Sequence, residues 1–278
     1  MSIPLIVLPE DWQDYYKIKT KGFKKLFRIE GKLFRKKDGR RTLRFKHKGN
    51  YYFGKFHSGV GWKKILKNLL QFRKPPVLSA KNEWKAILKL KELKVDTMQL
   101  VGYGQKGWNP AYRKSFVITE ELQNIISLED YCMDWDKISP DKAIKRAIIT
   151  KVAEIARTIH KNGINHKDLY ICHFLLDISS GLDNIDPEKI RLFLIDLHRV
   201  EIRSKIPFYW RAKDISAILF SSLDIGLTQK DIFRFMRIYH NTTLKKSLKK
   251  HWFFWWIVKK RALNLYRREY KKNPPGKW

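Results

Sequence analysis

Three short segments in which apolar and polar residues alternate constrain the fold of this chain more than any other feature of its sequence. Alternation places every second side chain on the same face of a sheet. The Asp38-Gly39 and Gly49-Asn50 dipeptides between the segments favour tight hairpin turns. The sequence therefore predicts an antiparallel meander, formed by residues 26–34, 42–46 and 51–56.

Apolar residues at helical spacing follow this meander. Residues 62–72 and 82–93 repeat apolar side chains every three or four positions, and Pro75-Pro76 separates the two segments. Alternation then returns, which predicts two further strands. These strands are residues 97–103 and 116–120.

Longer helices are predicted in the second part of the chain. One begins at Ser139-Pro140, with the serine as N-cap and the proline in the first turn, and ends at the left-handed cap Asn162-Gly163. Two short strands and two helices follow. The strands are residues 174–178 and 191–197, and the helices begin near Lys213 and at Thr228, which forms a capping box with Asp231.

The fold class that these patterns predict is α+β, with two lobes and a basic tail. A β-rich N-terminal lobe covers residues 1–121, and a helical C-terminal lobe covers residues 122–244. Residues 245–278 are expected to form a helix with 12 lysines and arginines, one acidic residue and a cluster of aromatic side chains. Aromatic rings flanked by lysines suit a membrane interface, and packing onto the helical lobe explains them equally well.

The charge of the chain indicates anionic partners. Lysines and arginines number 59 against 27 acidic residues, a net charge of +32. The two cysteines, Cys132 and Cys172, are too few for a disulfide scaffold or a cysteine-rich zinc site. No export signal is recognisable, and no apolar run approaches the roughly 18 residues that cross a bilayer. The expected location is therefore the cytoplasm, with attachment to an anionic lipid surface left open.

Two aspartates near the ends of predicted elements are candidates for catalysis. Asp168 follows the long helix, and Asp196 ends an apolar strand. Phosphoryl transfer uses such a pair, because one carboxylate accepts the proton of the attacking hydroxyl and another binds the magnesium ion of the nucleotide. It also uses a fixed cation. Lys55 lies on a predicted strand, and Glu83 on the next helix is placed to pair with it.

Each of these residues also has a simpler explanation. An aspartate after a strand is more often a turn or cap residue, and a histidine-lysine-aspartate tripeptide is common. However, a strand lysine, a helix glutamate, a loop aspartate and a strand-end aspartate follow one another in the order that protein-kinase-like folds require. The combination favours a bilobal protein-kinase-like fold.

Several segments resemble the bacterial lipopolysaccharide core heptose kinases, which phosphorylate the first inner-core heptose (heptose I). They are residues 40–45, 96–98, 127–132, 163–176, 195–199 and 226–232, and the run 170–176 is the most specific. The resemblance implies a kinase-like fold, ATP and Mg²⁺, and a lipopolysaccharide core heptose as acceptor. It also implies acyl carrier protein as a partner and a peripheral location on the cytoplasmic face of the inner membrane.

The resemblance implies roles in the C-terminal lobe. Asp168 becomes the catalytic base, with His166 and His173 as further catalytic residues. Asp196 becomes the metal-binding aspartate, with His173 as a second candidate ligand. Asp214 resembles the aspartate that braces the catalytic loop in kinase-like folds, although a charge in the first turn of a helix is an equal alternative.

The resemblance implies nucleotide contacts in the N-terminal lobe. Lys55 would hold the α and β phosphates and Glu83 would orient Lys55. The adenine would meet the backbone of Glu120, Glu121 and Leu122.

The chain departs from the protein-kinase pattern at three points. No Gly-x-Gly-x-x-Gly is present, so the basic turn between Gly31 and Gly39 must cover the phosphates, where Arg40 and its neighbours supply charge. His173 stands where an asparagine metal ligand is expected, and because magnesium prefers oxygen it is also a candidate to orient Asp168 or contact the sugar. His198 replaces the third glycine of the metal loop, which argues against regulation by loop flipping.

Two rival functions are left open. A basic nucleic-acid-binding protein explains the charge and the aromatic residues but not Asp168 and Asp196, so no nucleic acid partner is expected. A kinase of another hydroxyl, such as a protein tyrosine, an aminoglycoside or another core sugar, is the closer alternative, because one fold hosts many acceptors.

Overall fold

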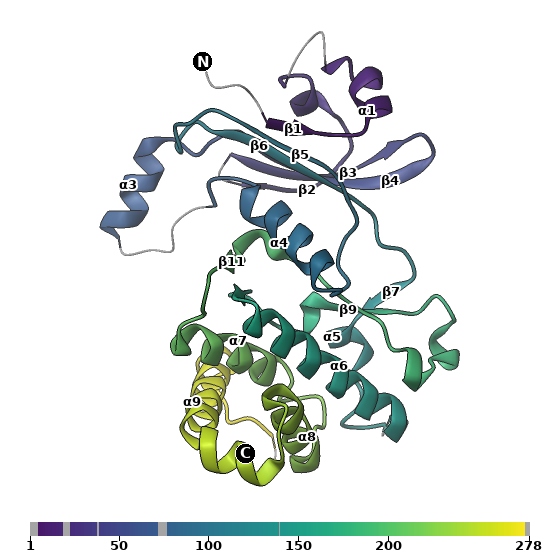
Figure 1. Cartoon of the computed structure of the whole chain (residues 1–278), viewed down its shortest axis with the longest axis vertical. Helices are drawn as coiled ribbons and strands as arrows, with labels where there is room; N and C mark the ends of the chain where they lie inside the picture. Colours follow the sequence, from purple (N-terminus) through teal and green to yellow (C-terminus); the bar gives the residue numbers. More distant parts are fainter. Residues whose placement is uncertain (1–4, 19–22, 38, 72–76, 139, 276–278) are drawn as a thin grey trace. The chain divides into compact units, whose positions relative to one another are not determined.

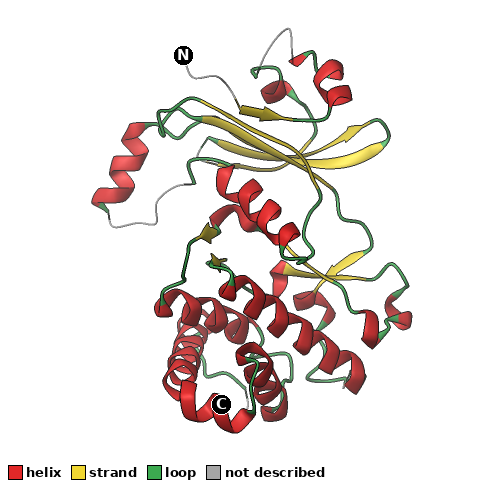
Figure 2. Ribbon diagram, in the orientation of Figure 1, coloured by secondary structure: helices red, strands yellow, loops and turns green. Residues whose placement is uncertain are grey.

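The chain folds into two compact units. The computed structural model describes residues 5–18, 23–37, 39–71, 77–138 and 140–275. Unit 1 comprises Met1–Lys89 and Met98–Leu122, and unit 2 comprises Leu90–Thr97 and Gln123–Trp278. Figure 2 shows that unit 1 carries the larger sheet and that unit 2 is mainly helical. The α+β class and the β-rich and helical parts that the sequence predicts are confirmed.

Unit 1 is built on a six-stranded sheet with the order β1-β5-β6-β4-β3-β2, in which all neighbouring strands are antiparallel (Figure 1). The predicted meander is β2-β3-β4. The strands are β1 (Leu5–Val7), β2 (Lys32–Lys37), β3 (Arg40–His47), β4 (Asn50–His57), β5 (Leu100–Lys106) and β6 (Lys114–Glu120).

Two details of the meander differ from the prediction. The first strand begins at Lys32, because Leu26–Arg28 form the 3-10 turn η1, whose Leu26 is fully buried in the core. The turn between β3 and β4 consists of Lys48 and Gly49, both with positive φ (46° and 90°), rather than Gly49-Asn50. Positive φ at both turn residues is the geometry of a type I′ hairpin, whose twist matches that of the strands.

The core of unit 1 lies between the sheet and the segment that precedes the meander in the chain. It consists of aromatic and aliphatic side chains from the sheet and from the segment before it, and α1 (Glu10–Tyr15) contributes Trp12. The helix α4 (Lys81–Glu92) lies between β4 and β5 in the chain and buries Trp84 and Ile87. The helix α3 (Trp62–Leu70) buries no residue, and Figure 1 shows it extending away from the end of the sheet.

The described residues of unit 2 form two small antiparallel sheets and five α-helices, with short 3-10 turns between them. The sheets have the orders β10-β9-β7 and β11-β8. The strands are β7 (Ile125–Ser127), β8 (Ile164–Asn165), β9 (Phe174–Asp177), β10 (Leu192–Leu194) and β11 (Glu201–Ile202). The helices are α5 (Leu128–Tyr131), α6 (Lys142–Lys161), α7 (Phe208–Ser221), α8 (Gln229–His240) and α9 (Leu244–Tyr270).

The ends of these helices test the predicted caps. Asn162 is the C-cap of α6 and Gly163 follows with φ 76°, as predicted. The capping box of Thr228 and Asp231 is also confirmed. The N-cap of α6 was predicted wrongly, because the Asp141 carboxylate accepts hydrogen bonds from the first-turn N–H groups.

The helix α7 begins earlier than predicted, at Phe208 after Pro207 rather than near Lys213. Its first turn has no side-chain cap, so the sequence carries only the proline as a start signal. Asp214 consequently lies inside the helix, and the alternative of a first-turn charge is wrong.

The segment predicted as a separate tail corresponds to α9 and lies within unit 2. One face of α9 packs into the unit through Phe254, Val258 and Tyr266, all buried. On the other face, Trp252 and Trp256 are 62% and 47% exposed. Packing onto the helical lobe is therefore confirmed for Phe254, whereas the membrane interface stays a prediction for the exposed Trp252 and Trp256. Within the described ranges, the length and apolarity that a bilayer-crossing helix requires are not combined in any helix.

Candidate active site

Asp214 fixes the loop that carries Asp168. This carboxylate is fully buried in α7 and accepts hydrogen bonds from the backbone N–H groups of His166 and Lys167, both at 2.8 Å. Asn165 Nδ2 donates to it at 2.7 Å, and His160 Nε2 lies at 3.2 Å. The predicted bracing of the loop by Asp214 is therefore present.

The charge on Asp214 is stabilised in place. Burial alone would raise the pKa of this carboxyl, but the hydrogen bond from His160 and the nearby His166 outweigh it and hold the pKa below its ordinary value. Asp214 is therefore an anion at neutral pH, and the loop is held by charge-assisted hydrogen bonds, which are the stronger kind.

Asp168 is held from two sides. Arg199 Nη1 lies 2.7 Å from each of its carboxylate oxygens. His173 Nδ1 donates a hydrogen bond of 2.7 Å to the Asp168 backbone carbonyl. The Asp168 side chain is 18% exposed, so it is positioned without being closed off. A carboxylate held in this way suits a general base, which must sit within hydrogen-bond reach of the hydroxyl it deprotonates.

Asp196 follows β10 in the left-handed conformation, with φ 60° and ψ 48°. Its carboxylate lies 2.6 Å from His198 Nδ1 through one oxygen and 3.5 Å from His173 Nε2 through the other. His173 thus contacts both aspartates. The Asp196 carboxylate alone would suffice as the protein ligand of a magnesium ion, because Mg²⁺ is usually bound by one or two carboxylates together with water and the phosphates of a nucleotide.

The two histidines expected to be catalytic have different environments. His166 is fully buried, its Nε2–H donates to the Ile195 carbonyl at 3.0 Å, and burial lowers the pKa of its imidazole. Its burial favours a positioning role, tying the Asp168 loop to the residue before Asp196, and the catalytic role of His166 stays a prediction. His173 offers nitrogen where magnesium prefers oxygen, so its contacts favour orienting the aspartates over binding the metal.

The strand β10, which precedes Asp196, is fixed by the segment before β5. The backbone N–H of Leu194 donates to the Asp96 carbonyl at 2.9 Å, and Thr97 Oγ1 donates to the Leu194 carbonyl at 2.6 Å. Arg191 Nη2 pairs with Asp96 at 2.8 Å. These contacts explain why the motif at residues 96–98 accompanies the two aspartates, although it lies far from them in sequence.

Unit 1 contains the predicted lysine–glutamate pair. Lys55 Nζ on β4 lies 2.6 Å from Glu83 Oε1 on α4. Glu83 is only 1% exposed, whereas the Lys55 side chain retains 22% exposure. The buried partner orients an ammonium group that remains partly open to solvent, as expected of a lysine that binds phosphate.

Some backbone groups of the segment expected to contact adenine already form hydrogen bonds within unit 1. The N–H groups of Glu120 and Glu121 donate to the carbonyls of Gln99 and Tyr51, at 3.0 and 3.1 Å. The Glu121 side chain forms a paired contact with Arg44, 2.7 Å at each oxygen. These two N–H groups are not available to hydrogen-bond adenine. The other backbone groups of residues 120–122 stay the candidates for that contact. Arg40 is the first residue of β3 and lies opposite the last residue of β2.

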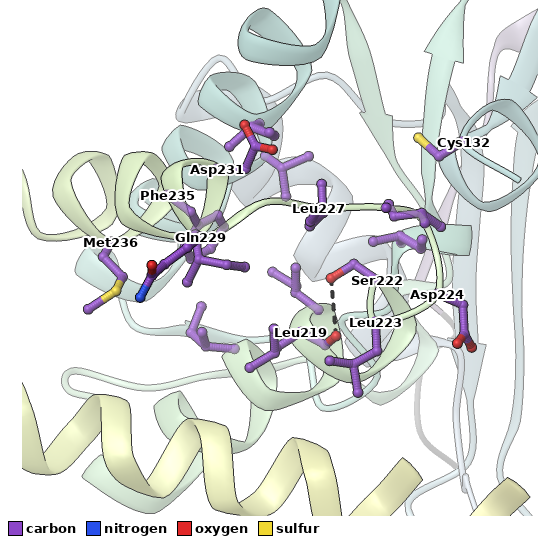
Figure 3. Close-up of a pocket in the computed structure, with 18 of the residues that line it drawn as sticks. Cys132, Leu219, Ser222, Leu223, Asp224, Leu227, Gln229, Asp231, Phe235 and Met236 are labelled. Atoms are coloured by element: carbon purple, nitrogen blue, oxygen red, sulfur yellow. Dashed lines mark hydrogen bonds between the residues drawn. The ribbon is translucent and has the colours of Figure 1, made fainter. Parts of the chain in front are cut away.

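A separate cavity of about 510 Å³ lies among the helices of unit 2 and does not include Asp168 or Asp196 in its lining (Figure 3). Its walls are mostly aliphatic and aromatic side chains from α5 to α9. Figure 3 shows Leu219, Leu227 and Phe235 among the lining residues, with Ser222 donating to the Leu219 carbonyl at 3.1 Å. Such a lining suits an apolar ligand rather than a nucleotide.

Sequence reasoning assigned no role to Arg199, although it lies inside the motif at residues 195–199. Its pairing with Asp168 spans 31 residues. No local pattern identifies such a contact, but a basic residue three positions after a metal-binding aspartate is a usable signal. His160, which supports Asp214 from α6, was likewise assigned only to the helix pattern.

Comparison with known proteins gives consistent results. The family model described as "Lipopolysaccharide kinase (Kdo/WaaP) family" matches residues 24–239. The lipopolysaccharide core heptose(I) kinase WaaP of Escherichia coli K12 is 48% identical over 227 residues, covering 81% of this chain and 84% of the relative. The Pseudomonas aeruginosa protein of that name is 43% identical over 241 residues, covering 87% and 88%.

A solved structure is similar as well. It is titled "WaaP in complex with acyl carrier protein", and it superposes with a TM-score of 0.81 at 36% identity, covering 94% of this chain and 99% of the other. This chain is therefore similar to characterised proteins in both sequence and fold.

Proposed function

This chain belongs to the lipopolysaccharide kinase (Kdo/WaaP) family, and on that premise we propose that it transfers the terminal phosphoryl group of ATP to a hydroxyl of heptose I in the lipopolysaccharide inner core. It is a phosphotransferase with an alcohol group as acceptor. The observation that carries the proposal is the position of His173, which contacts both Asp168 and Asp196. One side chain thereby links the backbone carbonyl of Asp168 to the carboxylate of Asp196, which supports a shared site for the two aspartates that phosphoryl transfer uses.

Asp168 acts as the base in this mechanism. It orients the sugar hydroxyl and accepts its proton as the oxygen attacks the terminal phosphorus, and ADP leaves on the opposite side. Asp168 forms no covalent bond with the substrate, so its contribution to the rate depends mainly on how accurately its carboxylate is placed. Asp214 and Arg199 supply that placement, from the backbone and from the carboxylate respectively.

In this mechanism the nucleotide contacts come from unit 1. Lys55, oriented by Glu83, binds the phosphates, and the backbone of residues 120–122 meets the adenine. Arg40 adds positive charge near the phosphates. Asp196 would hold Mg²⁺, which neutralises the charge that develops on the phosphate oxygens.

One experiment tests the function directly. Purified protein is incubated with magnesium ATP and lipopolysaccharide core oligosaccharide that lacks the heptose I phosphate, and the product is mapped by mass spectrometry. We expect one phosphate on heptose I and a loss of about a hundred- to ten-thousand-fold in rate for Asp168→Asn. Phosphate on another core sugar would support the rival acceptor, and full activity of the variant would place the base elsewhere.

Acyl carrier protein is a proposed partner, supported by the similar structure that contains it. A carrier of this class holds an acyl group, and the apolar cavity of unit 2 offers a place for such a group. The acylated carrier is then expected to bind more tightly than the carrier with a free thiol. Leu227→Trp, which fills part of the cavity, should remove that difference, and equal binding by both forms would exclude the cavity.

The proposed location is the cytoplasmic face of the inner membrane, with peripheral attachment. The acceptor is linked to lipid A, so the enzyme must work beside a bilayer. The exposed aromatic face of α9, formed by Trp252, Phe253 and Trp256 with Phe208 of α7, supports this location. Lysines flank it, and each contributes roughly 1 kcal/mol of attraction to an anionic lipid surface.

A further inference from the structure

The helix α3 has an apolar face that none of the described residues covers. Trp62, Leu66, Leu69 and Leu70 are all exposed, the last two at 70% and 78%. None of the nine residues of α3 is buried. Every other helix of comparable or greater length among the described elements buries residues of its apolar face. An amphipathic helix normally forms in order to bury that face, so α3 is built for a surface outside unit 1.

The polar face of α3 is basic. At about 100° per residue, the apolar side chains occupy one arc of the helix and Lys63, Lys64 and Lys67 occupy the opposite arc. No acidic residue lies between Asp38 and Glu83. The helix therefore presents leucines and a tryptophan bordered by lysines, which is the pattern of helices that lie in the plane of a membrane interface.

The base of α3 is anchored to the sheet of unit 1. The N–H groups of Val60 and Gly61 both donate to the Ala111 carbonyl, at 3.0 and 2.9 Å. The loop that contains Ala111 carries two further exposed aromatic residues, Trp108 and Tyr112. Tryptophan and tyrosine favour the headgroup level of a bilayer, so the anchoring loop has the same chemistry as the helix.

We propose that α3, together with the loop that anchors it, is a membrane-docking element that inserts its apolar face into an anionic lipid surface. The proposal extends the proposed function, since it identifies a part of unit 1 that brings the enzyme to a lipid-linked acceptor. Its lysines exclude a second copy of this chain as the occupant, because two such faces would place like charges together. An acidic protein partner is the alternative that the experiment must separate.

Site-specific fluorescence tests the proposal. Cys132 is buried, so in a Cys172→Ser background a single introduced cysteine can carry an environment-sensitive dye. Leu69→Cys places the dye on the apolar face, and Lys67→Cys places it about 200° around the helix. With vesicles of phosphatidylethanolamine and phosphatidylglycerol, the dye at position 69 should shift to the blue and be quenched by lipids brominated in the acyl chains. The dye at position 67 should do neither.

Two outcomes overturn the proposal. One is a dye at position 69 that shows neither the blue shift nor the quenching when these vesicles are added. The other is an equal response of the dyes at positions 69 and 67. Phosphatidylcholine vesicles should give a weaker response at position 69, because the lysines then lose their partner. A dye at position 69 that responds to acyl carrier protein but not to vesicles would assign α3 to a protein partner instead.

A double substitution measures the contribution of the face. Leu66→Gln with Leu69→Gln should weaken vesicle binding at least about tenfold, since two exposed leucines no longer enter lipid. Met133→Gln with Leu182→Gln is the matched control, because it removes two exposed apolar side chains from unit 2. Vesicle binding by the α3 variant that equals that of the control contradicts the proposal.

The assay on soluble acceptor separates this proposal from the proposed function. The α3 variant should phosphorylate the delipidated core oligosaccharide at the wild-type rate and lose activity only on acceptor embedded in vesicles. If the wild-type protein fails on the soluble acceptor, the proposed function is wrong whatever α3 does. If wild type and variant work equally on both acceptors, only the docking proposal is wrong.

Discussion

Arg199 Nη1 lies 2.7 Å from both carboxylate oxygens of Asp168, so the residue assigned as catalytic base is paired with a cation. The same arginine follows Asp196 by three residues, in the turn η5 (Leu197–Arg199). One short segment thus carries the carboxylate proposed to bind the metal and also contacts the proposed base. Displacement of this segment would affect both functions together.

Arg199→Gln should lower kcat by roughly a hundredfold, because small misplacement of a reacting group has effects of that size. The KM for ATP should change little, since Arg199 contacts no residue assigned to the nucleotide. Arg199→Lys should recover part of kcat. Steady-state kinetics with soluble acceptor provides the measurement. Arg234→Gln, which breaks a pair on α8, is the control, and equal kcat values for both glutamine variants would remove Arg199 from the mechanism.

Lys55→Met should abolish nucleotide binding and also destabilise unit 1, because it leaves the buried Glu83 carboxylate unpaired. Breaking such a pair costs about 3–5 kcal/mol. The double variant Lys55→Met with Glu83→Leu should regain most of the stability without regaining ATP binding. Thermal unfolding and nucleotide titration together distinguish the two effects. Recovery of ATP binding in the double variant would contradict the role of Lys55.

Asp214→Asn should reduce the free energy of unfolding by about 2–3 kcal/mol, since hydrogen bonds to a charged group contribute about that much. The loop N–H groups of His166 and Lys167 then lose an anionic acceptor. Urea unfolding measures the change. Asp183→Asn, an exposed aspartate of unit 2, serves as control. Identical unfolding midpoints would show that Asp214 does not brace the loop.

Acidification should destabilise unit 2 through His240. Burial, with His251 and Arg211 nearby, lowers the pKa of His240 from 6.5 to about 4. Between these values the unfolded chain binds a proton that the folded chain does not, so stability falls as the pH decreases from about 6.5 towards 4. His240→Gln should flatten this part of the curve. An unchanged slope in urea titrations across this range would contradict the assignment.

Replacing Trp252 and Trp256 by serine should weaken binding to anionic vesicles without unfolding the protein, because both side chains are exposed. Truncation at Lys250 is a poor test, since it also removes the buried Phe254 and Tyr266. Cosedimentation at two salt concentrations measures the lysine contribution, which screening should reduce. Wild-type binding by the double variant would indicate that α9 does not contact lipid.

The sequence predicted well where structure depends on local chemistry. Thr228 with Asp231, and Asn162 with Gly163, mark helix ends through bonds made within a few residues, and both predictions are confirmed. Lys55 and Glu83 were paired correctly because kinase-like order suggested it. The order of strands and helices was sufficient to predict the fold class.

Prediction failed where the deciding contact is distant. The burial of His166 depends on the strand before Asp196, and the pairing of Arg199 with Asp168 depends on a turn formed later in the chain. The contact of His166 has no local signature, and for Arg199 the usable signal is its position three residues after Asp196. The exposure of α3 was also unpredictable, since amphipathic spacing is the same whether a helix packs inside the protein or faces outwards.

The left-handed backbone of Asp196 has a consequence for control of the enzyme. This conformation costs a non-glycine residue about 1–2 kcal/mol. The contact between the Asp196 carboxylate and His198 offsets that cost, and His198 stands where the protein-kinase pattern has a flexible glycine. A carboxylate held through both its backbone and its side chain is restricted in orientation. We therefore expect the activity to follow the supply of acceptor and nucleotide rather than a flip of this loop.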